Sequence, residues 1–179
     1  MSQAGVISPF SRSAKHPSAE GGRGLACLIA EDPDDLAIHF AIRRAVFVGE
    51  QRLFDRSDRD GYDADPATLH ILGLCGRVAG GAVRIYPLGD DGLWKGDRLA
   101  VLPVFRIRGL GAPLVRFAVR TASERGGRRM LAYVQPQNVG FFRRLGWRAV
   151  GRPQEYVGRT HQRMEIELSP HPRPEGPRS

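Results

Sequence analysis

The sequence lacks several features that would identify particular classes of protein. Only two of its 179 residues are cysteines, Cys27 and Cys75. Both lie in apolar segments, so we expect buried free thiols and no disulfide. No Cys/His pair has the spacing of a zinc site, and we expect no metal. No run of 18 apolar residues is present, so no segment is expected to span a membrane. The first residues lack the apolar stretch of a secretion signal, which favours a cytoplasmic location.

The composition is that of one globular domain between two polar ends. Charged residues make up 26% of the chain and hydrophobic residues 41%, and the length suits a single core. Residues 1–24 are rich in Ser, Gly, Pro and Ala without apolar periodicity, and residues 169–179 contain four prolines. We predict a disordered N-terminal arm at 1–24, a folded domain at 25–168 and a disordered tail at 169–179.

The net charge of +8 is unevenly distributed along the chain. Residues 31–65 have a net charge of −5, and residues 106–148 have a net charge of +9. A basic stripe could bind RNA or DNA, which is one alternative. Because the basic half contains the glycine-rich turn described below, we favour an enzyme that binds an anionic cofactor on one wall and a cationic amine on the other. Solvated charges that only promote solubility are the simplest alternative.

Hydrophobic periodicity divides the domain into strands and helices. Strand-like apolar segments occur at residues 25–30, 69–75, 80–86, 98–102, 129–134 and 161–168. Helices are predicted at residues 33–47, 109–124 and 137–145. This order predicts an α/β or α+β protein of three layers, in which helices flank a single mixed sheet.

The most informative segment is the turn Arg106-Ile107-Arg108-Gly109-Leu110-Gly111-Ala112, which precedes a predicted helix. Free backbone N–H groups and the positive end of a helix dipole attract anions, and glycines allow close approach. Arg106 and Arg108 add two permanent positive charges. The turn lacks the Gly-Lys-Ser/Thr ending of a P-loop and the spacing of a dinucleotide site. We expect another phosphate-bearing ligand here, the alternative being a turn that only begins a helix.

The pattern Arg-x-x-Gly-x-Gly-Ala at 106–112 resembles the pyrophosphate-binding motif of the GNAT superfamily of acyl-CoA-dependent N-acyltransferases. The block Val-Gln-Pro-Gln-Asn-Val-Gly-Phe-Phe-Arg-Arg-Leu-Gly-Trp at 134–147 is similar to a second block of that superfamily. Residues 43–51 and the segment His161-Gln-Arg-Met164 are similar to blocks of one branch. The four blocks cover residues from about 36 to 168 in family order. Within that branch, the sequence is most similar to the N-acetyltransferases encoded with nitrilase-type nitrogen-starvation clusters.

The resemblance implies the GNAT fold, with a central mixed, mostly antiparallel sheet flanked by helices and with splayed fourth and fifth strands. It implies that the pantetheine arm pairs with the strand before the turn, where one backbone N–H could stabilise the developing oxyanion. The pyrophosphate is expected on the backbone N–H groups of the turn. The implied cofactor-binding residues are Leu99, Ala100, Val101, Arg106, Arg108, Gly109, Leu110, Gly111, Ala112, Asn138 and Phe142.

Acyl transfer to an amine also needs a base that removes the amine proton. Glu50 is the first candidate, because it lies in the branch block and in the acidic part of the chain; an ordinary carboxylate at a helix end is the alternative. His161, at the start of the last strand, is the second candidate, with a structural hydrogen bond as the alternative. Asp58 and Asp60 are expected to attract a cationic substrate, unless they only form a turn.

Phe142 departs from the family pattern. Many GNAT enzymes have at this position the tyrosine that protonates the departing thiolate, and a phenyl ring has no proton to donate. A thiol with a pKa of about 8.5 can nevertheless leave as its anion near neutral pH. Tyr133 and Tyr156 are alternative acids.

These observations predict an acetyl-CoA-dependent N-acetyltransferase that acts on a small primary amine by direct transfer in a ternary complex. The alternative, motivated by Phe142, is a catalytically silent acyl-CoA-binding or regulatory module. We expect acetyl-CoA and the amine as partners and neither nucleic acid nor membrane. The resemblance is also compatible with a homodimer.

Overall fold

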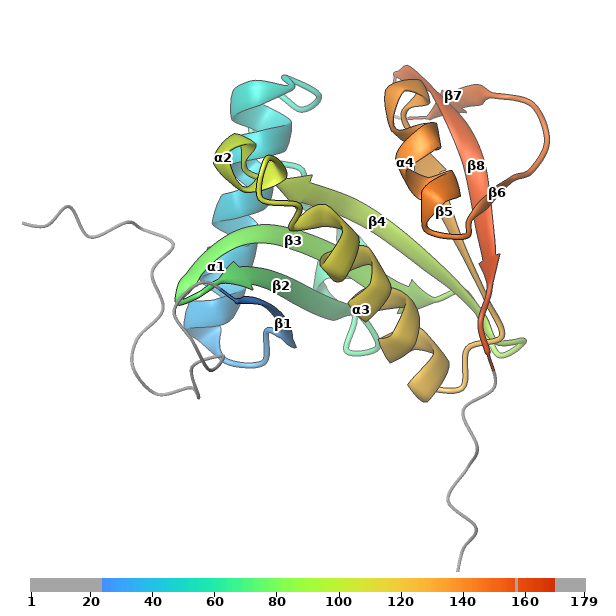
Figure 1. Cartoon of the computed structure of the whole chain (residues 1–179), viewed down its shortest axis with the longest axis horizontal. Coiled ribbons are helices and arrows are strands. Elements are labelled where there is room, and N and C mark those ends of the chain that lie inside the picture. The colour runs from blue at the N-terminus through green and yellow to red at the C-terminus, as the bar shows by residue number, and fades with distance from the viewer. Residues whose placement is uncertain (1–23, 157, 170–179) are drawn as a thin grey trace, which may run out of the picture.

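The computed structural model describes residues 24–156 and 158–169 (Figure 1). The predicted arm and tail lie outside these residues, apart from Gly24 and Ser169. Within the described residues, an eight-stranded sheet has the order β1-β2-β3-β4-β5-β8-β6, and β7 pairs with β8. Every pairing is antiparallel except that of β4 with β5. This mixed, mostly antiparallel sheet with flanking helices confirms the predicted fold class.

The bounds of the elements follow the chain. The strands are β1 (Leu25–Ile29), β2 (Leu69–Cys75), β3 (Val78–Pro87), β4 (Leu93–Val101), β5 (Arg129–Val134), β6 (Arg148–Ala149), β7 (Gln154–Tyr156) and β8 (Arg159–Glu167). The α-helices are α1 (Pro33–Arg44), α2 (Pro103–Arg106), α3 (Gly111–Glu124) and α4 (Val139–Arg144). Shorter helical turns are η1 (Ala45–Glu50), η2 (Gly61–Ala64) and η3 (Pro136–Asn138).

The six predicted strands and three predicted helices are all present, with shifted ends. The strand predicted at 98–102 begins at Leu93, because its first half is too polar to resemble a buried strand. The helix predicted at 33–47 is α-helical only to Arg44 and continues as a π-helical turn. The short strands β6 and β7 and the short helix α2 were not predicted, since two to four residues carry little periodicity.

Local sequence explains where α1 begins and ends. The side chain of Asp32 caps the helix by accepting a hydrogen bond from the backbone N–H of Asp35 at 2.8 Å. Pro33 occupies the first turn, where no backbone N–H is needed. Acidic residues in the first turn and basic residues in the last turn both complement the helix dipole.

Helices cover both faces of the sheet, which gives the three predicted layers. Figure 1 shows α3 in front of the sheet and α1 behind it. Leu114 and Ala118 of α3 pack in one core with Val83 and Ile85 of β3. Ile42 of α1 belongs to a second core, together with alanines and Leu72 of the sheet. Side chains that alternate along β3 therefore contribute to two different cores.

The feature that positions the site is a fork between β4 and β5. The two strands pair only over Leu93–Lys95 and Arg129–Leu131 and then separate. Beyond the last residue paired with β5, β4 bulges against β3: Ala82 pairs with Ala100 but Arg84 pairs with Asp97, so β4 has one extra residue. Arg98 takes up the irregularity with a positive φ of 53°. In the described part of the chain, no helix is long and apolar enough to cross a membrane.

Candidate functional site

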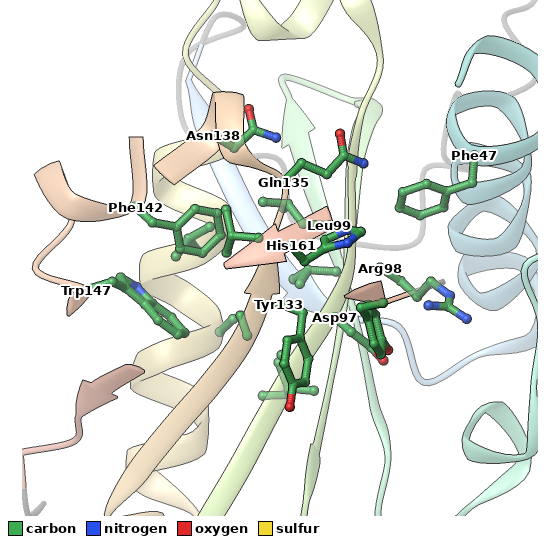
Figure 2. A pocket seen from close by; sticks show the side chains of 18 of the residues that line it. Phe47, Asp97, Arg98, Leu99, Tyr133, Gln135, Asn138, Phe142, Trp147 and His161 are labelled. Carbon is green, nitrogen blue, oxygen red and sulfur yellow. The ribbon is translucent and has the colours of Figure 1, made fainter. Parts of the chain in front are cut away.

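A cavity occupies the fork between the separated ends of β4 and β5 (Figure 2). The segment that follows α1 forms one wall, and α4 with Trp147 forms the other. The floor is made by β3 and α3. The lining residues are Phe47, Gln51, Leu53, Phe54, Val83, Ile85, Gly96, Asp97, Arg98, Leu99, Val115, Ala118, Met130, Ala132, Tyr133, Val134, Gln135, Asn138, Phe142, Trp147, Tyr156 and His161.

The glycine-rich turn lies beside the open end of the fork, where α2 and α4 stand on opposite sides (Figure 1). A Cβ on Gly111 would contact the ring of Phe141 in α4 at 3.4 Å, so the start of α3 adjoins the α4 wall. Gly109 has a φ of 76° and open space where a side chain would be. This positive φ explains the need for glycine, and the open space leaves room for a ligand.

The backbone of the turn has N–H groups available for an anion. The N–H groups of Gly109 and Leu110 donate within the turn, to the carbonyls of Arg106 and Phe105. Among the described residues, none accepts a hydrogen bond from the N–H groups at 108, 111 and 112. Of the five N–H groups predicted to bind the pyrophosphate, three therefore have no acceptor among the described residues. Leu110 itself is fully buried and serves as an anchor for the turn.

Two predicted cofactor arginines have protein partners. The guanidinium of Arg106 donates to the backbone carbonyl of Val101 at 2.8 Å and to both carboxylate oxygens of Glu50 at 2.6 Å. Arg108 lies 3.1 Å from the sulfur of Cys75. Cys75 and Cys27 are both free thiols, but they are only partly buried, whereas buried thiols were predicted. Burial raises the pKa of the Cys27 thiol to about 11, which keeps it protonated.

The position of Glu50 does not suit the base role predicted for it. Glu50 ends η1 and its side chain turns toward α2, whereas the next residue, Gln51, lines the cavity. The hydrogen bonds from Arg106 hold the pKa of Glu50 below its ordinary value, which makes this carboxylate a weaker base. The sequence placed Glu50 in the correct block, but its direction depends on a π-helical turn that no local pattern indicated.

His161 lies where a base could act. Its side chain is buried and projects into the cavity in Figure 2. Nδ1 lies 2.9 Å from the backbone carbonyl of Arg159. A carbonyl can only accept, so Nδ1 carries the hydrogen in this bond, and in the neutral form of the ring the lone pair is on Nε2. The ring also meets Tyr156 edge-on, at 5.4 Å between centroids, which fixes its orientation.

Asp58 and Asp60, which were predicted to attract a cationic substrate, both form ion pairs with arginines. Asp58 is buried, and its carboxylate lies 2.7 Å from Nε of Arg43. Asp60 lies 2.6 Å from Arg84 and 3.1 Å from Arg98. Partial burial raises the pKa of Asp60, but hydrogen bonds and charge from Arg84 outweigh that effect and lower it.

The aspartates belong to a buried network that sequence reasoning missed. Arg84 is fully buried and donates to Asp97 at 2.8 Å through two nitrogens, and it also contacts Asp63. Tyr86 donates a further hydrogen bond to Asp97 at 3.1 Å. Burial and the Asp97 charge both raise the pKa of Tyr86, so its hydroxyl stays neutral. A single arginine inside the apolar strand β3 was the signal that could have indicated this network.

The predicted pantetheine and thioester residues surround the fork. Leu99 lines the cavity at the bulge, whereas Ala100 and Val101 continue β4 beside it and pair with β3. Asn138 and Phe142 lie on the opposite wall, where Phe142 meets Trp147 edge-on at 5.3 Å. Of the eleven predicted cofactor residues, Leu99, Asn138 and Phe142 line this cavity.

Neither alternative acid reaches the position of Phe142. The ring of Tyr133 stacks on that of Tyr156 at 4.7 Å. In Figure 2 the Tyr133 hydroxyl points away from Phe142. The hydroxyl of Tyr156 accepts a hydrogen bond from Nζ of Lys95 at 3.1 Å. No group of three His, Cys, Asp or Glu side chains in residues 24–156 and 158–169 could hold a metal ion.

Comparison with known proteins identifies relatives of this architecture. Residues 75–168 match the family model described as the acetyltransferase (GNAT) domain. A Bacillus subtilis (strain 168) protein provisionally named an acetyltransferase is 32% identical over 131 residues, covering 73% of this chain and 88% of that protein.

Solved structures share the fold. A provisionally named N-acetyltransferase from Lactobacillus plantarum has a TM-score of 0.73 and 20% identity, over 81% of this chain and 99% of that one. BjaI, a CoA-dependent acyl-homoserine lactone synthase solved with SAM and isopentyl-CoA, has a TM-score of 0.67 and 21% identity, over 83% of this chain and 84% of its own.

Proposed function

The chain belongs to the GNAT acetyltransferase family, whose members transfer acyl groups from acyl-CoA, and we propose that it transfers the acetyl group of acetyl-CoA to a small primary amine. The transfer is direct, within a ternary complex of enzyme, acetyl-CoA and amine. The observation that carries this proposal is the position of His161 inside a fork whose open end adjoins the glycine-rich turn. Family membership favours this enzyme over the silent acyl-CoA-binding module that Phe142 suggested.

The cleft fits a coenzyme A thioester at both ends. The free N–H groups at 108, 111 and 112 would hold the pyrophosphate, with open space at Gly109 allowing close approach. Arg108 would add a positive charge. Arg106 would add less, because Glu50 already neutralises its charge. The separated edge of β4 at Leu99 would receive the pantetheine arm. Acetyl-CoA supplies an acyl group that is already activated as a thioester.

The residues of the chain then have distinct roles in the transfer. Nε2 of His161 would accept the amine proton as the new C–N bond forms and the C–S bond breaks. A backbone N–H at the β4 bulge, such as that of Leu99, would donate to the carbonyl oxygen as it becomes negative. Phe142 supplies no proton, so the sulfur leaves as a thiolate, which a thiol of pKa about 8.5 permits near neutral pH. Phe142 and Trp147 exclude water from this end.

Three finer assignments complete the proposal. We place the reaction in the cytoplasm and assign the chain to the nitrogen-starvation branch of the family. We also propose a homodimer, which sedimentation would test. The branch and the homodimer rest on the sequence resemblance.

The first test is calorimetric titration with acetyl-CoA, and with coenzyme A and ATP as comparisons. We expect micromolar binding of both coenzyme A compounds and none of ATP, since the turn lacks P-loop ligands for a triphosphate. A panel of small amines scored by thiol release would then identify acceptors. No binding of acetyl-CoA at millimolar concentration would contradict the cofactor assignment, and binding without turnover on any amine would contradict the proposed reaction.

A further inference from the structure

The inner end of the fork cavity is apolar, in contrast to its polar mouth. The polar part of the lining includes His161 and the side chains of Gln51 and Gln135, which hydrogen-bond to each other at 3.2 Å. The inner end is lined by β3, β5 and α3 and merges with the core that α3 covers; its side chains are Val83, Ile85, Val115, Ala118, Met130 and Ala132. An amine acceptor has no use for this surface, because nothing there can hydrogen-bond to it.

Small residues keep the inner end open. Gly96, Ala118 and Ala132 contribute at most one methyl group each to the lining, and they come from three different elements. A Cβ on Gly96 would lie 3.5 Å from the sulfur of Met130 and would occupy part of the space between β4 and β5. On the side wall, the rings of Phe142 and Trp147 pack edge-to-face, and this packing holds both rings out of that space.

The space exceeds what an acetyl group needs. The cavity has a volume of about 130 Å³, close to the roughly 150 Å³ of an apolar protein cavity that binds benzene, a molecule of six carbons. This is the volume of the whole cavity, so the amine and the end of the pantetheine arm beside Leu99 share it. An acetyl group adds a single methyl beyond the thioester carbonyl and would cover little of the apolar lining.

We propose that the inner end is an acyl-chain pocket and that the enzyme accepts thioesters of uncharged aliphatic acids of about four to six carbons in addition to acetyl-CoA. This inference rests on the proposed function, since it needs the thioester carbonyl beside Leu99 at the bulge. From there a chain would extend between β4 and β5 toward Ala118 of α3. Each methylene buried in this way strengthens binding about fourfold.

The same geometry excludes charged acyl groups. The lining carries two charged side chains, Asp97 and Arg98, and both point away from the α3 side into the network with Arg84 and the aspartates. A carboxylate at the end of the chain, as in a succinyl group, would be buried among Val115, Ala118 and Met130 without a partner. Butyryl and succinyl groups have equal carbon numbers, so the pair separates chain length from charge.

The experiment measures binding and amine transfer for acetyl-, butyryl-, hexanoyl- and succinyl-CoA, in the wild type and in Ala118→Leu. In the wild type we expect butyryl- and hexanoyl-CoA to bind at least as tightly as acetyl-CoA and succinyl-CoA to bind at least about tenfold more weakly than butyryl-CoA. Ala118→Leu should weaken hexanoyl-CoA at least about tenfold and change acetyl-CoA less than about threefold. Arg120→Leu, on the exposed side of α3, is the matched control and should change neither donor.

Several outcomes would overturn the pocket. The wild type could bind butyryl-CoA far more weakly than acetyl-CoA, or Ala118→Leu could weaken all donors equally with an unchanged melting temperature. If Ala118→Leu fails to fold, Ala132→Val makes the same test with one isopropyl group in place of a methyl group. Because binding is measured separately, a protein that binds hexanoyl-CoA but acylates no amine would support the pocket and contradict the proposed reaction.

Discussion

Glu50 and Arg106 form a two-point ion pair, with 2.6 Å between each carboxylate oxygen and a guanidinium nitrogen. The pair connects the end of η1 to α2, next to the glycine-rich turn. The pair consists of the carboxylate that the sequence suggested as a base and the arginine that it suggested for the pyrophosphate. The two side chains therefore restrain each other at the edge of the site.

Glu50→Gln should leave turnover within about threefold of the wild type, because this carboxylate lies outside the cavity lining. It should also tighten acetyl-CoA binding severalfold, since Arg106 loses its counter-charge and becomes free for phosphate. Steady-state kinetics and calorimetry measure the two effects. A hundredfold drop in kcat with unchanged acetyl-CoA affinity would instead identify Glu50 as the base, as the sequence first suggested.

His161→Gln should lower kcat/KM about a hundredfold or more, because glutamine cannot accept the amine proton. Acetyl-CoA affinity should stay the same, since His161 lies on the amine side of the fork. Raising the pH toward the pKa of the amine should narrow the difference in kcat/KM between variant and wild type, because the amine is then deprotonated in solution and needs no base. A uniform loss at all pH values would indicate a structural role for the ring.

Gly109→Asp should reduce acetyl-CoA affinity at least about tenfold. The substitution places a negative charge beside the free N–H groups and forces a side chain into a φ of 76°. Gly109→Asn is the matched control, because asparagine tolerates this φ and has nearly the same shape without the charge. If both variants bind acetyl-CoA like the wild type, the turn does not hold the pyrophosphate.

Arg84→Met should destabilise the fold by about 3–5 kcal/mol, because it leaves the buried carboxylate of Asp97 without its arginine and removes one of the two arginines that contact Asp63. Denaturant unfolding measures the change. Arg120→Met removes an equal charge from the exposed face of α3, where Arg120 pairs with Glu124 at the surface, and should cost less than about 1 kcal/mol. Equal effects in the two variants would mean that the network contributes nothing beyond net charge.

Stability should fall as the pH decreases from about 7 to 5. Burial lowers the pKa of both His39 and His70 below the ordinary value of 6.5, which the unfolded chain retains. In this window the unfolded state binds protons that the folded state does not. Each of the two histidines therefore lowers the free energy of unfolding by up to about 1.4 kcal/mol for every pH unit of acidification. Urea unfolding at several pH values measures the slope, and a double His39→Gln, His70→Gln variant should flatten it.

Much of the fold could be predicted because its signals are local. The apolar segments of β1, β2, β3 and β5 and the helical spacing of α3 can each be recognised within a short stretch of sequence. The glycine-rich turn could be located from its residue types alone, since N–H groups, a helix start and a positive φ depend on neighbours in the chain. The polar first half of β4 could not be predicted, because Lys95, Gly96 and Asp97 resemble a loop until their partners are known.

The site was predicted in part. His161 and Phe142 both face the cavity, as the family blocks implied, whereas Glu50 and Asp58 are bound by arginines. Tyr133 and Tyr156 were considered only as acids, but they form a stacked wall. Nothing in a linear pattern distinguishes a carboxylate that is free from one that is paired, because the partner is not a sequence neighbour.

The sequence by itself determined the family, the order of the elements and the location of the glycine-rich turn, because each depends on residues within a few positions of one another. Only the tertiary structure decided which charged groups remain available for chemistry. The two residues of the Glu50–Arg106 pair are 56 positions apart, and those of the Arg84–Asp60 pair are 24 apart. It also decided that the fork opens into an apolar inner end, since that space is bounded by side chains of separate strands and a helix that meet only after folding.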